Sequence, residues 1–447
     1  MRYAFILGRV YTLSVAELVA ILEKPDQSLI LTPLRNEASV VKDEAVKILE
    51  ASEEVLIIET PGPLNVSNLQ KKLGGVIKIL EVIDIIKKRE GDSVNFALKH
   101  YFKPSVLKNQ FFKDYKGKVQ FGLSVYILDM ALLQRPEKKP GNDARGDFGN
   151  IFSEPKRVGM MIKKGLTDTG ASVRLVLPEF NSLTLASVVV TKNQLLQKGA
   201  EICILAAQDK IFTAKTLTVQ DFEDYGRRDY QRPVRDEKQG MIPPKVAQIM
   251  LNLCNCNAGE TVLDPFCGIG TIIQEGLLLG YRMVGSDINK VAIKGSEQNL
   301  EWFRNRYKIP PSKYGLEVYD ATKISELIQK FGQKISGIVT ECTLGPMYGQ
   351  YPKPPEIEKN FKDLEKLYKL SFKEFAKFLP QKARVVICLP AYRKGRNDYE
   401  MFGNLDFIGA LGYTLVDIIS PGLAKNLKFL KLTNRKTAIY DKRSDCG

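Results

Sequence analysis

A short apolar strand that runs directly into a glycine turn and a helix constrains this chain most. Glu260-Thr-Val-Leu-Asp264 leads into Pro265-Phe-Cys-Gly-Ile-Gly-Thr271, and an apolar stretch over 272–279 ends at Gly280. Glycines in such a turn let the backbone approach a ligand closely. Strand, glycine turn and helix in this order are typical of a Rossmann-like sheet, where ligands bind at the ends of the strands.

Two further strands are expected to end in acidic residues at the same edge of the sheet. Arg282-Met-Val-Gly-Ser-Asp287 places a carboxylate 23 positions after Asp264, where it can accept both ribose hydroxyls of a nucleoside cofactor. A strand over 316–319 delivers Asp320-Ala321, where a carboxylate can hold an adenine amino group. For each acid the alternative is a helix cap, before helices near Asn289 and over 324–330.

The glycine pattern also bears on which cofactor the turn holds. Position 273, where a dinucleotide fingerprint has its third glycine, is Ile, so pyrophosphate binding is not favoured. The sequence therefore favours S-adenosylmethionine over NAD. The expected cofactor-binding residues are Asp264, Pro265, Phe266, Cys267, Gly268, Gly270, Thr271, Asp287, Ile288, Asp320 and Ala321.

A fourth strand over 335–340 leads into Glu341-Cys-Thr-Leu-Gly-Pro346 and Tyr348. Active-site loops belong at this edge of such a sheet. Methyl transfer to an exocyclic amine requires a hydrogen-bond acceptor for the amine and a flat surface against the base. We therefore expect Glu341, Pro346 and Tyr348 to be the catalytic residues, with Glu341 as acceptor and Tyr348 stacking on the base.

Composition limits the partners that the chain can have. Its 447 residues carry 66 Lys and Arg against 51 Asp and Glu, a net charge of +15 that suits a nucleic acid but also serves general solubility. Cys254 and Cys256 are too close for a usual zinc pair, and His100 is the one histidine, so no metal is expected. No stretch is apolar over the ~18 residues of a membrane span, and a cytoplasmic location is expected.

The chain is long enough for several domains. We expect a ferredoxin-like α/β domain over 1–93, a second basic α/β domain over 94–224, a charged linker over 225–243 and a Rossmann-like domain over 244–447. Predicted strands of the first two domains are 3–8, 28–31, 55–59, 77–86, 118–128, 172–177, 186–190, 201–206 and 210–219, and predicted helices are 14–23, 68–73 and 154–165.

Together these motifs resemble the tRNA guanine-N2 methyltransferases that modify guanine 10 and carry an N-terminal RNA-binding module of THUMP type. The resemblance covers residues 220–447 most clearly, since the cofactor motifs above follow Arg228-Asp-Tyr-Gln-Arg-Pro233 and Gly240-Met-Ile-Pro-Pro-Lys-Val-Ala247 in that family's order. Residues 187–200 and 211–224 look like the end of a THUMP domain. The resemblance implies a mostly parallel, seven-stranded sheet in the C-terminal domain.

The resemblance also implies a partner. The N-terminal domains would hold tRNA by its shape and phosphates, so that the target guanine reaches the pocket. It leaves open whether a small activating protein subunit is needed. Candidate RNA contacts are Lys156, Arg157, Lys163, Lys164 and Arg174, although a solvated basic surface explains each of them equally well.

The chain departs from the family at the catalytic loop. Where the family has Asp-Pro-Pro-Tyr, this chain has Glu341-Cys342-Thr343-Leu344, which keeps only the acid. Alternatives that remain are a DNA or ribosomal RNA amino-methyltransferase, and a non-catalytic tRNA-binding protein with a degenerate methyltransferase domain. An NAD-dependent enzyme fits less well, as does covalent catalysis by Cys267 or Cys342, because neither cysteine follows a proline.

Overall fold

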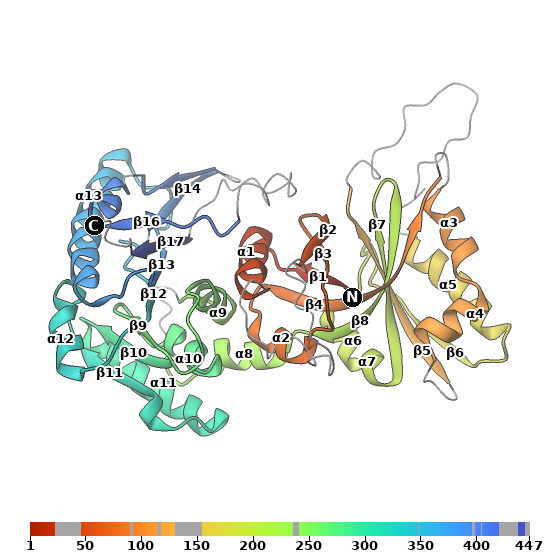
Figure 1. The fold of residues 1–447 in the computed structure, drawn as a ribbon, viewed down its shortest axis with the longest axis horizontal. Helices are drawn as coiled ribbons and strands as arrows, with labels where there is room; N and C mark the ends of the chain where they lie inside the picture. Colours follow the sequence, from red (N-terminus) through yellow and green to blue (C-terminus); the bar gives the residue numbers. More distant parts are fainter. Residues whose placement is uncertain are drawn as a thin grey trace, which may run out of the picture.

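The computed structural model describes residues 1–22, 46–89, 93–113, 118–129, 154–235, 241–346, 348–395, 398–403, 405–419 and 437–442. Within them, an eight-stranded N-terminal sheet and a seven-stranded C-terminal sheet are joined by helix α8, Phe222–Tyr230 (Figure 1). The strand expected at 28–31 lies outside the described residues. No helix of the described part is long and apolar enough to cross a membrane.

The first half of the N-terminal sheet has the strand order β2-β3-β1-β4. With one helix after β1 and another after β3, this is the arrangement of a ferredoxin-like sandwich. The six elements are β1 (Arg2–Leu7), α1 (Tyr11–Leu22), β2 (Lys47–Ala51), β3 (Val55–Glu59), α2 (Val66–Lys72) and β4 (Val76–Lys87).

The sheet continues without a break across residue 93, in the order β4-β8-β7-β5-β6. Helices α3 and α5 pack on one face of this second half, where they bury Leu98 and Ile162 against Phe121 and Ile202. The elements are α3 (Val94–Tyr101), α4 (Pro104–Val106), a π-helical turn (Leu107–Phe111), β5 (Val119–Ile127), α5 (Glu154–Thr167), β6 (Val173–Val176), β7 (Gly199–Ala206) and β8 (Lys210–Val219).

The strand predicted at 186–190 is wrong. Residues Ser187–Lys192 form helix α6, followed by α7 at Leu195–Lys198. The valine run has high strand propensity, but Val190 is buried in a small cluster with Leu185 and Leu195, and this packing favours a helix there.

A buried ion pair lies in the middle of the N-terminal sheet and joins its two halves. Lys78 of β4 places its Nζ 2.6 Å from Oε1 of Glu201 on β7, and both side chains are almost fully buried. The Glu201 carboxylate also accepts hydrogen bonds from Ser124 Oγ at 2.6 Å and Thr216 Oγ1 at 2.7 Å. Lys78 donates a second bond to the carbonyl of Leu185 at 2.8 Å. The charges are therefore paired and hydrogen-bonded, as buried charges must be.

The C-terminal sheet has the order β11-β10-β9-β12-β13-β17-β16. Its first five strands are parallel and β17 is antiparallel to both neighbours, which confirms the mostly parallel, seven-stranded sheet that the resemblance implies. The strands are β9 (Thr261–Asp264), β10 (Arg282–Asp287), β11 (Tyr314–Val318), β12 (Gly337–Glu341), β13 (Arg384–Cys388), β16 (Tyr413–Leu415) and β17 (Thr437–Lys442).

Helices cover both faces of this sheet (Figure 1). Successive strand residues such as Val262 and Leu263 enter different cores, because side chains alternate across a strand. One core holds α9 (Pro244–Leu253), α10 (Thr271–Leu278) and α11 (Lys290–Tyr307), and the other holds α12 (Ile324–Phe331), α13 (Pro354–Phe378) and α14 (Asp406–Ala410). A hairpin of β14 (Ala391–Gly395) and β15 (Asp398–Met401) follows β13.

The charged stretch expected as a linker over 225–243 overlaps helix α8. Asp221 caps this helix by accepting a hydrogen bond from the Asp224 amide at 2.9 Å, and Arg227 and Arg228 lie in its last turn. The two halves also meet directly, because Asn252 of α9 donates to the buried Glu17 of α1 at 2.6 Å. The two modules are therefore packed together, and α8 lies between them.

We predict that the Lys78–Glu201 pair contributes strongly to stability. Lys78→Met leaves the Glu201 carboxylate buried without its cation and should lower the free energy of unfolding by about 3–5 kcal/mol in urea titrations. Adding Glu201→Gln should recover much of the loss. The matched control is Lys210→Met, which removes the partly exposed pair with Glu50 at 2.8 Å and should cost less than about 1 kcal/mol. Equal losses in the two single variants would contradict this role.

Candidate functional site

The turn between β9 and α10 has the backbone shape that only glycine adopts easily. Gly268 and Gly270 have positive φ values of 50° and 87°. A side chain at Gly270 would come within 2.4 Å of Ser296 Oγ on α11, whereas at Gly268 it would meet nothing within 4 Å. Gly270 therefore lets α11 pack closely, and Gly268 leaves the space above the turn open.

The carboxylate of Asp287 joins this turn to the loop after β10. Its Oδ2 accepts a hydrogen bond from the Gly268 amide at 2.9 Å, and its Oδ1 accepts one from the Asn289 amide at 2.8 Å. The cap of α11 is Asn289 itself, which accepts from the Val291 amide at 2.9 Å. Since each carboxylate oxygen has two lone pairs, Asp287 retains acceptor capacity for ligand hydroxyls.

Asp264 lies beneath the turn and is almost fully buried. Thr340 Oγ1 of β12 donates to its Oδ1 at 2.7 Å, and the Phe266 amide donates at 3.2 Å. Burial is the main cause that raises the pKa of Asp264 to about 7. The two hydrogen bonds lower this pKa, whereas the nearby charges of Asp287 and Glu341 raise it. A positively charged ligand group near this carboxyl is expected to favour its ionised form.

Asp320 follows β11 and has two roles available to it. Its Oδ1 accepts hydrogen bonds from the amide and the hydroxyl of Thr322, both at 2.8 Å, so it caps the short helix that follows. The same residue lines the cavity described below. The cap expected as an alternative is thus present without removing Asp320 from the site.

Helix α13 supports the loop after β12. The buried Tyr368 donates from its hydroxyl to the carbonyl of Thr343 at 2.7 Å. Gly345 has a φ of 88°, and a side chain there would come within 2.2 Å of the Asn360 amide. Glu341 ends the strand partly buried, and burial raises the pKa of its carboxyl. The loop therefore has a fixed shape, although it lacks the two prolines of the resembling family.

Aromatic side chains gather beside this loop. Tyr392 of β14 is stacked on Phe361 of α13, with ring centroids 5.5 Å apart and an interplanar angle of 30°. Tyr348 meets Tyr392 edge-on at 5.8 Å. The Tyr392 hydroxyl accepts a hydrogen bond from Asn360, the same residue that contacts Gly345. The aromatic surface and the loop are therefore held by one helix.

All of these parts open into one cavity of about 1120 Å³. Among the described lining residues there are four carboxyl groups, those of Asp264, Asp287, Asp320 and Glu341, and no lysine, arginine or histidine. Such a wall suits a cationic ligand with hydroxyl groups and does not suit one with several phosphates. The predicted site residues on its wall are Asp264, Pro265, Phe266, Cys267, Gly268, Thr271, Asp287, Ile288, Asp320, Ala321, Glu341, Pro346 and Tyr348.

Gly270 is not among the lining residues, and its backbone serves the packing of α11 instead. The thiols of Cys267 and Cys342 are buried, which raises the pKa of both and keeps them neutral. The described residues contain no group of three or more possible ligands that could hold a metal ion. The candidate RNA contacts lie in the N-terminal half, on α5 for Lys156, Arg157, Lys163 and Lys164 and on β6 for Arg174.

Sequence reasoning missed three parts of the wall. Met241, Ile242 and Pro243 line it from the segment before α9, Pro390, Ala391 and Tyr392 line it from the residues that follow β13, and Leu367 lines it from α13. The second group had a usable signal, since the apolar run at 384–388 is a further parallel strand ending at the same edge. The first group comes from no strand end. Its signal was the motif over 240–247, which the resemblance places ahead of the cofactor turn but which was not assigned to the site.

Two family models of methyltransferases match this chain. A family model described as an RMKL-like methyltransferase domain matches residues 232–401. A second model, described as a DNA methylase, matches residues 69–298, which is just over half of the chain.

Curated relatives include two proteins named tRNA (guanine(10)-N2)-dimethyltransferase. That of Methanothermobacter thermautotrophicus is 31% identical over 142 residues, 32% of this chain and 37% of the relative. That of Methanocaldococcus jannaschii is 30% identical over 193 residues, 42% of this chain and 50% of the relative. The chain therefore spans half or less of the length of these two relatives.

Among solved structures, TrmN from Thermus thermophilus covers 99% of this chain and 100% of its own, with a TM-score of 0.50 and 13% identity. At this identity the likeness shows a shared fold. Since one family model matches more than half of the chain and the other matches the region of the cavity, the chain belongs to the methyltransferase family that the DNA methylase model describes, with an RMKL-like methyltransferase domain in its C-terminal half.

Proposed function

We propose that this chain is an S-adenosylmethionine-dependent RNA methyltransferase that methylates the exocyclic N2 amine of a guanosine, at position 10 of tRNA. One observation carries the proposal: the glycine turn, the acids that end β10 and β11, and the loop after β12 open into a single cavity. Cofactor and target base can therefore meet in one place, as methyl transfer requires.

The cavity wall fits the proposed cofactor. S-adenosylmethionine supplies a methyl group on a positively charged sulfur and carries no phosphate. Asp287 would accept hydrogen bonds from its ribose hydroxyls and Asp320 from its adenine amine. Ile288, whose side chain is exposed at the cavity, would cover the adenine ring.

Glu341 is proposed to accept a hydrogen bond from the target amine. This bond orients the nitrogen lone pair toward the methyl group, and the carboxylate can take the proton that the amine loses after transfer. Because burial raises the pKa of Glu341, its carboxylate is a stronger acceptor than an exposed one. Pro346, Tyr348 and Tyr392 would form the flat surface against the base.

Several features support tRNA as the substrate. The curated relatives carry that name, the chain has a net charge of +15, and an eight-stranded α/β module precedes the methyltransferase domain. The competing substrate is DNA, which the description of the second family model favours. The two differ in one readout, the nucleoside that becomes methylated.

The first test is transfer of labelled methyl groups to unmodified tRNA transcripts, duplex DNA and a ribosomal RNA fragment. We expect N2-methylguanosine in tRNA, and Glu341→Ala should lower kcat by at least about a hundredfold because the amine loses its acceptor. Glu358→Ala, which removes an exposed acid of α13 that does not line the cavity, is the control. Methylated DNA would contradict the substrate, and an active Glu341→Ala variant would contradict the role of Glu341.

The second test concerns the aromatic surface. Stacking of a base on an aromatic ring is worth about 1–3 kcal/mol, so Tyr392→Ala should lower kcat/KM for tRNA by about tenfold or more. Tyr392→Phe keeps the ring and should remain close to the parent. Tyr351→Ala controls for damage to the hairpin, because Tyr351 bonds Glu400 of β15 from outside the cavity wall. If Tyr392→Phe loses as much as Tyr392→Ala, the hydroxyl and not the ring is what matters.

The third test uses pH. The free protein has Asp264 with a pKa of about 7, and a bound sulfonium charge should lower this pKa by favouring the carboxylate. Affinity for S-adenosylmethionine should therefore rise from pH 6 to pH 7.5 and then level off, with a slope of at most about tenfold per pH unit. Calorimetric titrations across this range should show a weaker slope for S-adenosylhomocysteine, whose sulfur is neutral. Asp264→Asn should flatten the difference, and an unchanged difference would contradict the assignment.

A further inference from the structure

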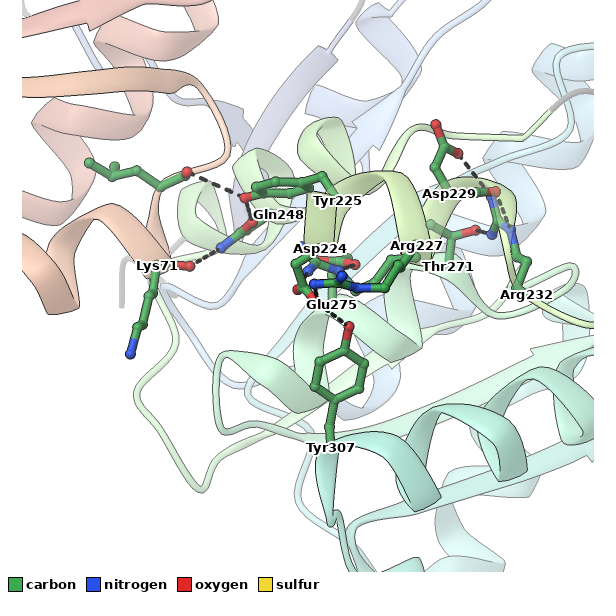
Figure 2. Close-up of polar contacts among 12 residues, drawn as sticks. Lys71, Asp224, Tyr225, Arg227, Asp229, Arg232, Gln248, Thr271, Glu275 and Tyr307 are labelled. Atoms are coloured by element: carbon green, nitrogen blue, oxygen red, sulfur yellow. Dashed lines mark hydrogen bonds and ion pairs between the residues drawn. The ribbon is translucent and has the colours of Figure 1, made fainter. Parts of the chain in front are cut away.

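Helix α8 touches both halves of the protein. The Tyr225 hydroxyl donates to Gln248 Oε1 of α9 and lies 3.4 Å from the carbonyl of Leu73 (Figure 2). Gln248 in turn donates to the carbonyl of Lys71 at 2.7 Å, at the end of α2. The N-terminal module and the methyltransferase domain thus share a hydrogen-bond network with α8 at its centre.

Arg228 anchors the same helix on α10. Its Nε lies 2.7 Å from Glu275 Oε1 and its Nη2 lies 3.2 Å from Oε2, while Nη1 bonds Asp224. The Arg228 and Glu275 side chains are 5% and 1% exposed. Burial lowers the pKa of the Arg228 guanidinium, but the charge and hydrogen bonds of Glu275 raise it by more, so the net shift is upward. This two-bond pair fixes how α8 lies across α10.

Arg232 reaches the opposite end of α10, at the cofactor turn. Its Nη1 donates to Thr271 Oγ1 at 2.6 Å, and its Nη2 lies 3.3 Å from Asp229 Oδ1 (Figure 2). Thr271 is the first residue of α10, follows Gly270 and lines the cavity. Arg232 itself is not on the cavity wall. It therefore acts on the site through Thr271.

This placement is electrostatically unfavourable by itself. The Arg232 side chain is 0% exposed, and the amino-terminal end of a helix carries a partial positive charge that repels a cation. The carboxylate of Asp229, which is 30% exposed, offsets only part of this cost. What Arg232 does supply is a rigid, directional donor that holds the Thr271 hydroxyl in one orientation.

A second contact fixes the same segment to the turn. Asn299 of α11 donates from Nδ2 to the carbonyls of Val234 and Ile269, both at 3.0 Å, and accepts from the Val234 amide at 2.8 Å. The residues after α8 are therefore linked to the turn directly at Thr271 and through Asn299 at Ile269. A turn held in its binding shape loses less entropy when a ligand binds.

We propose that Arg232 is a positioning residue of the cofactor site, which acts through the Thr271 hydroxyl to hold the 265–271 turn in its binding shape. Through α8 it links this turn to the N-terminal module. The inference rests on the proposed function for the identity of the ligand. Its effect is on affinity for the cofactor in the folded protein, which a purely structural arginine would leave unchanged.

The test measures S-adenosylmethionine binding to the full chain by calorimetry, well below the unfolding temperature of each variant. Arg232→Gln and Thr271→Val should each weaken binding by about tenfold or more, since a hydrogen bond to a charged group is lost. The double variant should be no weaker than the weaker single one, because both changes remove the same contact. Arg232→Lys should recover part of the affinity, since it keeps the charge but not the planar fork.

The matched control is Arg227→Gln in the last turn of α8. Its guanidinium lies 3.9 Å from Glu223 and 3.6 Å from Asp224, and neither residue belongs to the 265–271 turn. This variant should bind the cofactor as the parent does. If Arg232→Gln does not fold, Arg232→Lys decides, because it keeps the charge and removes the planar donor without changing a residue of the cavity wall.

Variants that lower the unfolding temperature but bind like the parent would overturn the inference and leave the proposed function standing. A parent chain that does not bind S-adenosylmethionine would overturn both.

Discussion

The site depends on the hydrogen bonds that the Asp287 carboxylate accepts from the amides of Gly268 and Asn289. These bonds connect the end of β10 to the turn after β9. This is possible because parallel neighbouring strands deliver their carboxyl ends to one edge of the sheet. With Gly270 allowing α11 to approach and Thr340 holding Asp264 from β12, three adjacent strands fix one turn. The cavity is thus a direct consequence of the strand order.

The loop after β12, which departs from the resembling family, is supported by its surroundings. In the resembling family, prolines stiffen this loop and an aromatic residue follows them, whereas here Cys342, Thr343 and Leu344 stand in their place. Stiffness instead comes from Tyr368, which binds the Thr343 carbonyl, and from Asn360 packed against Gly345. The aromatic surface comes from Tyr392, on a hairpin that Asn360 also contacts. These contacts give the loop after β12 a packed shape without the prolines.

The sequence was sufficient to predict elements and site residues where the side chains repeat with a regular period or where a residue ends a predicted strand. Asp264, Asp287, Asp320 and Glu341 were predictable because each follows an apolar strand of the same sheet. The sequence was insufficient to predict structure where tertiary contacts determine the conformation of a segment. The valines of α6 have strand propensity, yet their packing places them in a helix. Helix α8 shows no apolar period because ion pairs bury its inner face, with Arg228 against Glu275. Tyr392 lies at the site because the hairpin after β13 places it there, and no strand end of the large sheet marks its position.

The net charge of the chain and the charge of the cavity wall have opposite signs. The chain carries a net charge of +15, yet the described wall of the cavity contains four carboxyl groups and no basic side chain. Positive charge outside the cavity attracts a polyanion by long-range electrostatics. An acidic wall inside repels phosphates and favours a cation. A nucleic acid would therefore be held over the surface while its backbone is kept out of the pocket. Under the proposed function, the unit that enters would be a single uncharged base, whose amine would meet Glu341 and the methyl donor together.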